Sequence, residues 1–231
     1  MSVKDQLLEI YREYKADPAF NHMREHASFV PGRGSMNPEL IMVGEAPGAA
    51  EDASGKPFKG PSGKVLDRLL SDIGLDRRNI FITNVVKYRP IIGQIIRRNR
   101  APSPKEIDAS RPYLRRELDV FRDLGVSVVT LGNTPLRALY RPDKANHKSK
   151  IGEWHGHGWY DAYRMYFAMY HPSVVLYDEG RYDELLDDMR RMSEAFGVGA
   201  WADGGVCICG SIHAPGEWVD HPILTRKDTT R

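Results

Sequence analysis

Three polar residues in this chain stand where apolar stretches end. Glu45 and Asn84 each close an apolar run, and His171 follows a run of aromatic and apolar residues. A carboxylate can stabilise a cationic centre or position an attacking water. A carboxamide offers a donor and an acceptor to the polar edge of a ligand, and an imidazole can stabilise a developing negative charge. These three side chains could therefore assist a bond cleavage that separates charge.

The first of the three lies in a loop rich in glycine and proline. Residues 44–48 read GEAPG and follow the apolar run 40–43. Glycine lets the backbone approach a ligand closely, whereas Pro47 fixes its own φ. Two acids and the aromatic Phe58 follow. The G-x-G-x-x-G pattern of dinucleotide-binding loops is absent, so this loop predicts another kind of ligand site.

Apolar stretches and helical patterns alternate along the chain. The predicted strands are residues 40–43, 79–86, 126–131 and 166–170. The predicted helices are residues 3–14, 62–73, 104–124, 136–140 and 180–196. This order favours an α/β protein, a three-layer α/β/α sandwich on a four-stranded, mostly parallel sheet. Parallel strands end at one edge of a sheet, so Glu45, Asn84 and His171 should face one cleft.

The composition sets limits on the class of protein. The chain has 231 residues, of which 41% are hydrophobic and 28% charged, which suits a globular domain over residues 1–196 and a C-terminal extension over 197–231. The net charge of +2 requires that any nucleic-acid surface be a local patch. The chain has no long apolar run and begins with an amphipathic pattern, so we expect a cytoplasmic protein that does not enter a membrane.

Four segments together resemble family 4 of the uracil-DNA glycosylase superfamily. They are GEAPG-x-x-ED-x-x-G-x-PF-x-G from Gly44 to Gly60, TNVVKYRP, KEIDASRPYLRREL and YHPSVVLY. The resemblance covers about residues 29–195 and implies the uracil-DNA glycosylase fold. It also implies a DNA glycosylase of base excision repair, which flips uracil out of DNA and hydrolyses its N-glycosidic bond.

The resemblance assigns roles to the polar residues. Glu45 becomes the acid that stabilises the sugar cation or positions water, Asn84 the reader of uracil N3–H and O4, and His171 the group at uracil O2. Phe58 becomes the ring that stacks on the flipped base. The remaining implied substrate-binding positions are Gly44, Ala46, Pro47, Gly48 and Ser173.

Two segments are expected to contact DNA. The basic residues around the arginine-rich loop could neutralise phosphates, or this loop could be merely solvated: Lys87, Arg89, Arg97, Arg98 and Arg100. By resemblance, four residues after the histidine motif would enter the minor groove and fill the gap left by the flipped base: Val174, Val175, Leu176 and Tyr177.

The chain departs from family 4 at the residues that hold its four-iron, four-sulfur cluster. Tyr88 stands in the cysteine position of VKCRP, Ser110 stands in that of EIxACRP, and residues 15–30 contain no cysteine. We therefore expect no iron–sulfur cluster and no cofactor requirement for catalysis. The C-terminal extension could be a free tail or a structural flap, or it could bind zinc through four residues: Cys207, Cys209, His213 and His221.

The sequence thus predicts a monomeric, bacterial or phage-encoded uracil-DNA glycosylase that acts on uracil-containing DNA. Two alternatives stay open. Gly48 leaves room near C5 of the base, which would also suit a glycosylase for another deaminated or modified base. A non-catalytic DNA-binding relative that retains the pocket is the second alternative, although the intact Glu45, Asn84 and His171 favour an enzyme.

Overall fold

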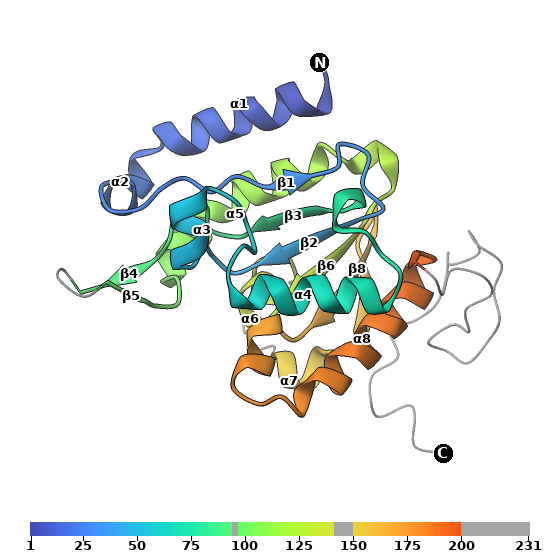
Figure 1. The fold of residues 1–231 in the computed structure, drawn as a ribbon. Helices are drawn as coiled ribbons and strands as arrows, with labels where there is room; N and C mark the ends of the chain where they lie inside the picture. Colours follow the sequence, from blue (N-terminus) through green and yellow to red (C-terminus); the bar gives the residue numbers. More distant parts are fainter. Residues whose placement is uncertain (94–96, 141–149, 200–231) are drawn as a thin grey trace.

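Apolar strands form a mixed sheet at the centre of the chain (Figure 1). The computed structural model describes residues 1–93, 97–140 and 150–199. The sheet has six strands in the order β1-β3-β2-β6-β8-β7. Their bounds are β1 Arg33–Gly34, β2 Leu40–Gly44, β3 Phe81–Asn84, β6 Ser127–Leu131, β7 His157–Tyr160 and β8 Met165–Met169. The four predicted strands are the inner ones, and they pair in parallel.

The sequence analysis missed both edge strands. β1 and β7 pair antiparallel with β3 and β8, and they are two and four residues long. Such short segments carry no clear alternation of apolar and polar residues, so their strand state depends on the neighbour that pairs with them.

The parallel register brings the strand ends to one edge. Gly44 at the end of β2 pairs with Asn84 at the end of β3. Leu131 at the end of β6 pairs with Met169 at the end of β8. The loops that follow these strands therefore start side by side, as the predicted cleft requires.

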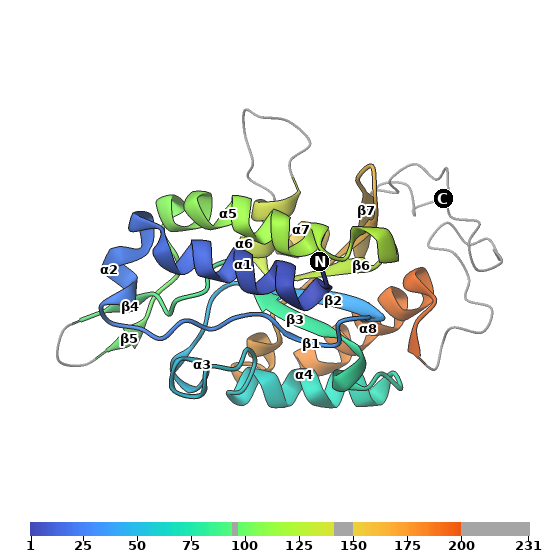
Figure 2. The same cartoon turned by 90° about the horizontal axis from the view of Figure 1, so that it is seen from above.

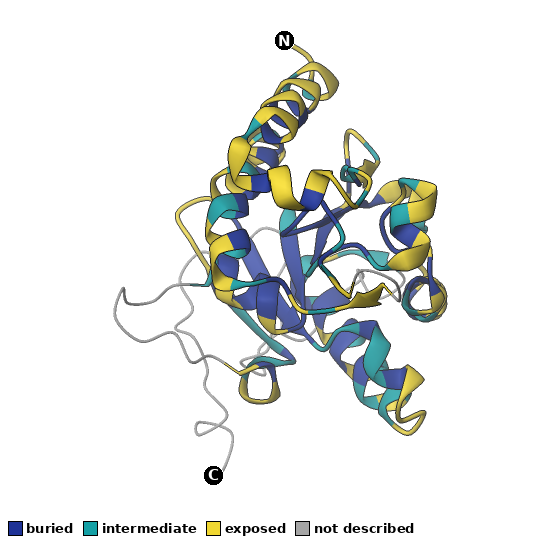
Figure 3. Cartoon of the chain, turned by 90° about the vertical axis from the view of Figure 1, so that its left-hand side faces the viewer, coloured by how far each residue is buried: buried dark blue, intermediate teal, exposed yellow. Residues whose placement is uncertain are grey.

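Helices cover both faces of the sheet, and Figure 2 shows the three layers from above. One face carries α1 (Val3–Ala16), α5 (Pro104–Asp119) and α6 (Asn133–Leu139), and the other carries α4 (Pro61–Asp72) and α8 (Arg181–Phe196). Alternate residues of the inner strands enter opposite cores, which explains why these strands are mostly apolar. The sheet is accordingly buried between helices with exposed outer faces (Figure 3). The predicted three-layer α/β/α fold is confirmed.

Short elements connect these layers. They are α2 Asn21–Arg24, α3 Ala49–Ser54, α7 Ile151–Trp154, η1 Pro18–Phe20, η2 Arg77–Asn79, η3 Arg122–Leu124 and η4 Pro172–Leu176. The arginine-rich loop forms a hairpin of β4 (Ile91–Ile92) and β5 (Arg98–Asn99), which projects from the body beside α3 (Figure 1). Ser103 caps the start of α5, which ends at Asp119, before the predicted end at residue 124, and η3 follows it.

Within the described residues, no helix combines the length and the apolar character that crossing a membrane requires. The predicted zinc ligands at 207, 209, 213 and 221 lie outside the described residues, as does most of the extension 197–231. The proposed boundary at residue 196 is the last residue of α8.

Candidate active site

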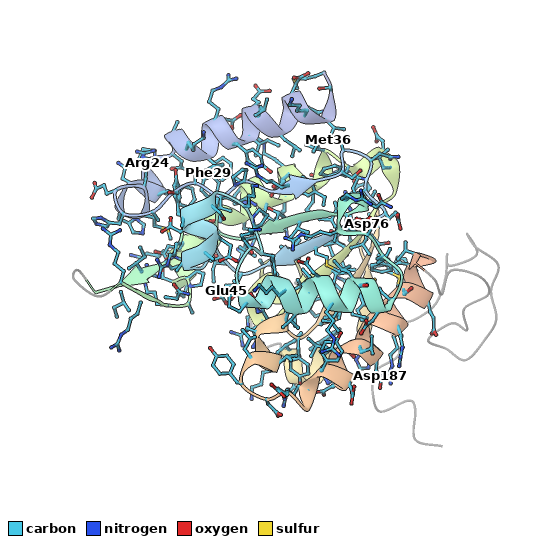
Figure 4. All side chains as sticks on the ribbon, in the orientation of Figure 1. Arg24, Phe29, Met36, Glu45, Asp76 and Asp187 are labelled. Carbon is cyan, nitrogen blue, oxygen red and sulfur yellow. The ribbon has the colours of Figure 1, made fainter. Side chains whose placement is uncertain are left out.

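A cavity of about 600 Å³ opens at the edge where the inner strands end. Its lining includes Glu45, Phe58, Asn84 and His171, which come from four separate segments. A volume of this order suits a small organic ligand. The structure therefore brings together all four side chains that the sequence analysis placed in a substrate site. Figure 4 labels Glu45 at this edge, between α3 and the start of α4.

Glu45 is half-buried just after β2, and its carboxylate is oriented by a side chain from another strand end. The hydroxyl of Thr134, at the start of α6, donates to Oε2 of Glu45. One carboxylate oxygen is thereby fixed, which limits how the side chain can turn in the cavity. Thr134 was not predicted as a site residue, although the polar run that begins at Gly132 after β6 was a signal of the same type.

Asn84 is buried at 3% exposure, and its amide packs against the backbone of β2. A Cβ on Gly44 would lie 2.4 Å from Oδ1 of Asn84 and 2.7 Å from the Phe58 ring. Only glycine leaves room for both side chains at this point. Gly44 therefore acts by permitting close packing, rather than by touching a ligand itself.

Phe58 adopts a left-handed backbone conformation with φ +51°, which is unusual for a bulky residue. Two features hold it there. A Cβ on Gly63 would lie 1.9 Å from the Phe58 carbonyl oxygen, so α4 approaches this carbonyl closely. The Arg77 guanidinium donates to the carbonyl oxygens of Pro57 and Phe58 at 2.8 and 3.0 Å. The result places the ring 5.5 Å from that of His171, centroid to centroid.

His171 follows β8 and caps η4 with its own ring. The Ser173 backbone N–H donates to Nδ1 at 3.2 Å, and the Ser173 hydroxyl lies 2.8 Å from the same atom. Because Nδ1 accepts, a neutral ring carries its proton on Nε2, which can donate into the cavity. Burial lowers the pKa of His171 to about 4, and Glu51 partly opposes this shift. The imidazole is therefore a neutral donor near pH 7.

The loop after β2 is held by acids that the sequence analysis noted without assigning a role. Glu51 is buried and accepts from the backbone N–H groups of Gly48, Lys59 and Gly60 at 2.7–3.0 Å. Three donors to one carboxylate fix the two ends of the loop against each other. The predicted substrate-binding residues Ala46, Pro47 and Gly48 line the cavity in this held loop.

Three of the predicted phosphate-contacting cations have acidic or amide partners within the protein. Lys87 is 1% exposed, and its ammonium lies 2.6 Å from Glu117 in the core. Arg100 donates to both carboxylate oxygens of Glu106 at 2.5 and 2.7 Å. The buried Lys87 cannot reach a phosphate without breaking its pair, which corrects that prediction. Arg100 is 31% exposed and lines the cavity, so its phosphate contact stays a prediction.

Arg89 is the third of these cations. Its side chain is only 11% exposed, it faces Asp52 at 3.8 Å, and its Nε donates to Oδ1 of Asn99 at 2.7 Å. Arg97 and Arg98 are exposed on the hairpin, as the phosphate interpretation requires. Asn99 also lines the cavity and was missed by the sequence analysis, because a single amide in a polar loop gives no signal.

The predicted minor-groove segment divides into two halves. Val175 is buried, and Val174 packs partly buried against the same core, which includes α4 and α8 residues. Val175 anchors η4 and is not free to enter a groove, which corrects that prediction, whereas the groove contact of the partly buried Val174 stays a prediction. Leu176 and Tyr177 are 50% and 90% exposed and line the mouth of the cavity.

The residues in the cluster positions of family 4 do not fit an iron–sulfur cluster. Tyr88 is buried among aromatic rings, with its centroid 6.0 Å from that of Tyr14 and 5.6 Å from that of Phe29. The Ser110 hydroxyl lies 2.8 Å from the Tyr14 hydroxyl. Both groups already pack or hydrogen-bond internally, and neither offers a thiolate. Among the described residues, no cluster of three or more His, Cys, Asp or Glu side chains could hold a metal ion.

This chain is similar in sequence to several known proteins. A type-4 uracil-DNA glycosylase of Saccharolobus solfataricus is 40% identical over 172 residues, which are 72% of this chain and 75% of that protein. One of Archaeoglobus fulgidus is 32% identical over 199 residues, 84% of this chain and 94% of that protein. Among solved structures, Pedobacter heparinus SMUG2 aligns with a TM-score of 0.44 at 13% identity, over 68% of this chain and 74% of that one.

The family model of the uracil DNA glycosylase superfamily matches residues 31–196, which contain every strand of the central sheet and all four cavity side chains named above. This chain belongs to the uracil-DNA glycosylase superfamily.

Proposed function

We propose that this protein excises uracil from DNA by hydrolysing its N-glycosidic bond, with Glu45, Asn84 and His171 as the catalytic residues. The observation that carries the proposal is the single cavity that Asn84 and His171 enter together with Glu45 and Phe58. The similarity to type-4 uracil-DNA glycosylases supports the same substrate.

Recognition depends on the buried amide of Asn84. A uracil flipped into the cavity would bond this amide through N3–H and O4 while Phe58 stacks on its ring. Cytosine presents a different pattern of donors and acceptors at the same edge, so the amide would disfavour it. The close packing of Asn84 against Gly44 restricts the amide to a narrow range of positions.

Bond cleavage leaves negative charge on the base, largely at O2. The neutral His171 ring can donate from Nε2 to that oxygen because Ser173 occupies Nδ1. The sugar becomes cation-like, and the Glu45 carboxylate, held by Thr134, can stabilise it or position the attacking water. Asn99 adds a second amide to the cavity wall from the hairpin side.

DNA would be held by the rim of the cavity. The exposed Leu176 and Tyr177 would occupy the space of the flipped nucleotide, and the exposed Arg97 and Arg98 would contact phosphates. We further propose that the enzyme acts as a monomer in the cytoplasm and that residues 1–196 carry the activity.

Catalysis in this proposal needs neither a cluster nor a metal. The C-terminal residues Cys207, Cys209, His213 and His221 could hold one structural zinc ion. Metal analysis of the purified protein should give no stoichiometric iron. A zinc content of about one per chain, lost in Cys207→Ser without loss of activity, would support the zinc site.

A direct assay tests the proposed function. Oligonucleotides that carry one uracil, in single- and double-stranded form, should yield free uracil and an alkali-labile abasic site. Parallel substrates with hypoxanthine, xanthine or modified pyrimidines test the alternative of another base, which Gly48 leaves open. Binding to uracil DNA without any product would instead support a non-catalytic relative.

A further inference from the structure

A buried ion pair lies behind the cavity and takes no part in the chemistry proposed above. Lys87 and Glu117 are 1% and 0% exposed, and Nζ of Lys87 lies 2.6 Å from Oε2 of Glu117. Burial lowers the pKa of Lys87, an effect that Glu117 opposes. A buried pair of this kind is weak as a source of stability, because both charges must leave water. Its contacts point to another role.

The Lys87 ammonium has a further acceptor at the site itself. Nζ donates to the backbone carbonyl oxygen of Asn84 at 2.6 Å and to the Thr83 hydroxyl at 2.5 Å. Asn84 is the residue whose side chain enters the cavity. The lysine, which does not itself line the cavity, thus binds the backbone of the residue proposed to read the base.

The N–H end of the same peptide unit is also hydrogen-bonded. The N–H of Val85, which shares a peptide plane with the Asn84 carbonyl, donates to the Gly44 carbonyl oxygen at 2.9 Å. The next N–H, of Val86, donates to the carbonyl oxygen of Glu45 at 3.1 Å. A peptide unit is planar, so contacts at both ends fix its orientation. The charged ammonium that donates to the Asn84 carbonyl also polarises this peptide unit. The polarisation strengthens the hydrogen bond from the Val85 N–H to the Gly44 carbonyl oxygen.

Glu117 extends these contacts to two helices. Its carboxylate accepts from Thr83 at 3.0 Å and from the Tyr11 hydroxyl of α1. Tyr11 in turn accepts from the backbone N–H of Gly32 at 3.0 Å. The ammonium is therefore placed by α1 and α5 together, and it transmits that placement to the ends of β2 and β3.

We propose that Lys87, held by Glu117, is a positioning residue that fixes the Asn84–Val85 peptide and thereby aligns the Asn84 amide and the Glu45 loop for the reaction. This inference rests on the proposed function of Asn84 and Glu45. It predicts that loss of the ammonium slows the chemical step in protein that still folds and binds DNA.

The test is the double variant Lys87→Met/Glu117→Gln. It removes both charges, keeps an amide that can bond Tyr11 and Thr83, and leaves the Asn84 carbonyl without its charged donor. A single-turnover rate constant at saturating enzyme does not depend on the fraction of folded protein, so it reports the site and not the stability. We expect it to fall by about 10- to 100-fold, the order that a small misplacement costs, while the dissociation constant for uracil DNA stays within about twofold of wild type.

The matched control is Arg116→Met. It removes the exposed ion pair between Arg116 of α5 and Glu13 of α1, whose charged atoms lie 2.5 Å apart. It should leave the single-turnover rate constant unchanged. Lys87→Arg, which retains a cationic donor, should recover part of the lost rate. A double variant that folds and excises uracil at the wild-type rate would overturn the proposal.

If both Lys87 variants fail to fold, hydrogen exchange in the wild-type protein tests whether the Asn84–Val85 peptide is fixed. The Val85 amide should exchange with deuterium only on global unfolding, and fast exchange of this amide in the folded protein would overturn the proposal. Because exchange needs no substrate, it also separates this inference from the proposed function. A wild-type protein with a protected Val85 amide but no uracil excision would contradict the function alone.

Discussion

The segments that follow β3 and β8 satisfy their polar groups in opposite ways. After β3, Lys87 pairs with Glu117 of α5, and Arg89 contacts Asp52 of α3 and Asn99 of β5. After β8, His171 bonds to Ser173, two residues away. The polar groups of the first segment are therefore held by distant parts of the domain, and the imidazole of the second is held within its own turn.

The two segments also expose different residues. After β3 the charged residues turn inward, and the exposed cations come only with the hairpin at Arg97 and Arg98. After β8 it is the apolar and aromatic end, Leu176 and Tyr177, that faces solvent. Residue type alone would predict the opposite pattern of exposure in the two segments, because arginine and lysine are usually exposed and leucine is usually buried. Variants in each segment should therefore separate effects on chemistry, stability and DNA contact.

The largest expected effect is that of His171→Ala. It removes the Nε2 donor to the uracil anion, and loss of one such donor costs on the order of 10²–10³ in rate, roughly 3–4 kcal/mol. The hydrogen bonds described for the His171 ring are all to Ser173, within the same turn. We therefore expect the variant to fold and to bind DNA normally. Single-turnover assays check the rate, and Ser173→Ala should show a smaller loss. Wild-type excision by His171→Ala would remove the histidine from the mechanism.

Next in size is the contrast between Val175→Ala and Tyr177→Ala. Val175 is buried in the core, so its truncation should lower the free energy of unfolding by roughly 2 kcal/mol. Tyr177 is 90% exposed, so its truncation should change stability by less than about 0.5 kcal/mol. It should instead slow excision from double-stranded DNA more than from single-stranded DNA. Chemical denaturation and paired assays measure both effects; equal stability of the two variants would contradict the division of η4.

A smaller effect should distinguish Arg98→Ala from Arg89→Ala. Removal of an exposed phosphate contact lowers the slope of log K against log salt by about 1, and Arg98 should show this change. Arg89 is only 11% exposed, so its removal should leave the slope unchanged and should slow excision by releasing Asn99. Binding titrations over a range of salt concentrations give the slopes. A reduced slope in Arg89→Ala would show that this side chain does reach the DNA.

The last expected effect concerns pH. The pKa of His171 falls from 6.5 to about 4 in the folded protein, so below pH 6.5 the unfolded chain takes up a proton that the folded chain does not. Stability should therefore decline between about pH 6.5 and pH 4 through this group, with no contribution above that range. His171→Gln should show a shallower decline, which denaturation at several pH values would detect. An identical pH profile in the variant would mean that His171 titrates normally.

Particular residues show how far the sequence could determine the site. Glu45, Asn84 and His171 stand at the ends of apolar runs, and the parallel order of strands and helices brings such ends together. The family motifs then gave their chemical roles. The three-layer fold followed from the same alternation, whereas β1 and β7 did not, because a strand of two or four residues is defined by its partner.

The roles of the basic residues were decided only by the tertiary structure. The sequence places Lys87, Arg89, Arg97, Arg98 and Arg100 within fourteen positions of one another, and charge alone does not distinguish them. The fold supplies a buried carboxylate to Lys87 and a capping carboxylate to Arg100, while the hairpin leaves Arg97 and Arg98 exposed. Apolar patterning determines which segments form the core, because burial of apolar surface needs no particular partner. A buried charged group, in contrast, needs one particular partner of opposite charge. The packing of α5, α3 and the hairpin around β3 determined which partner each of these basic residues has.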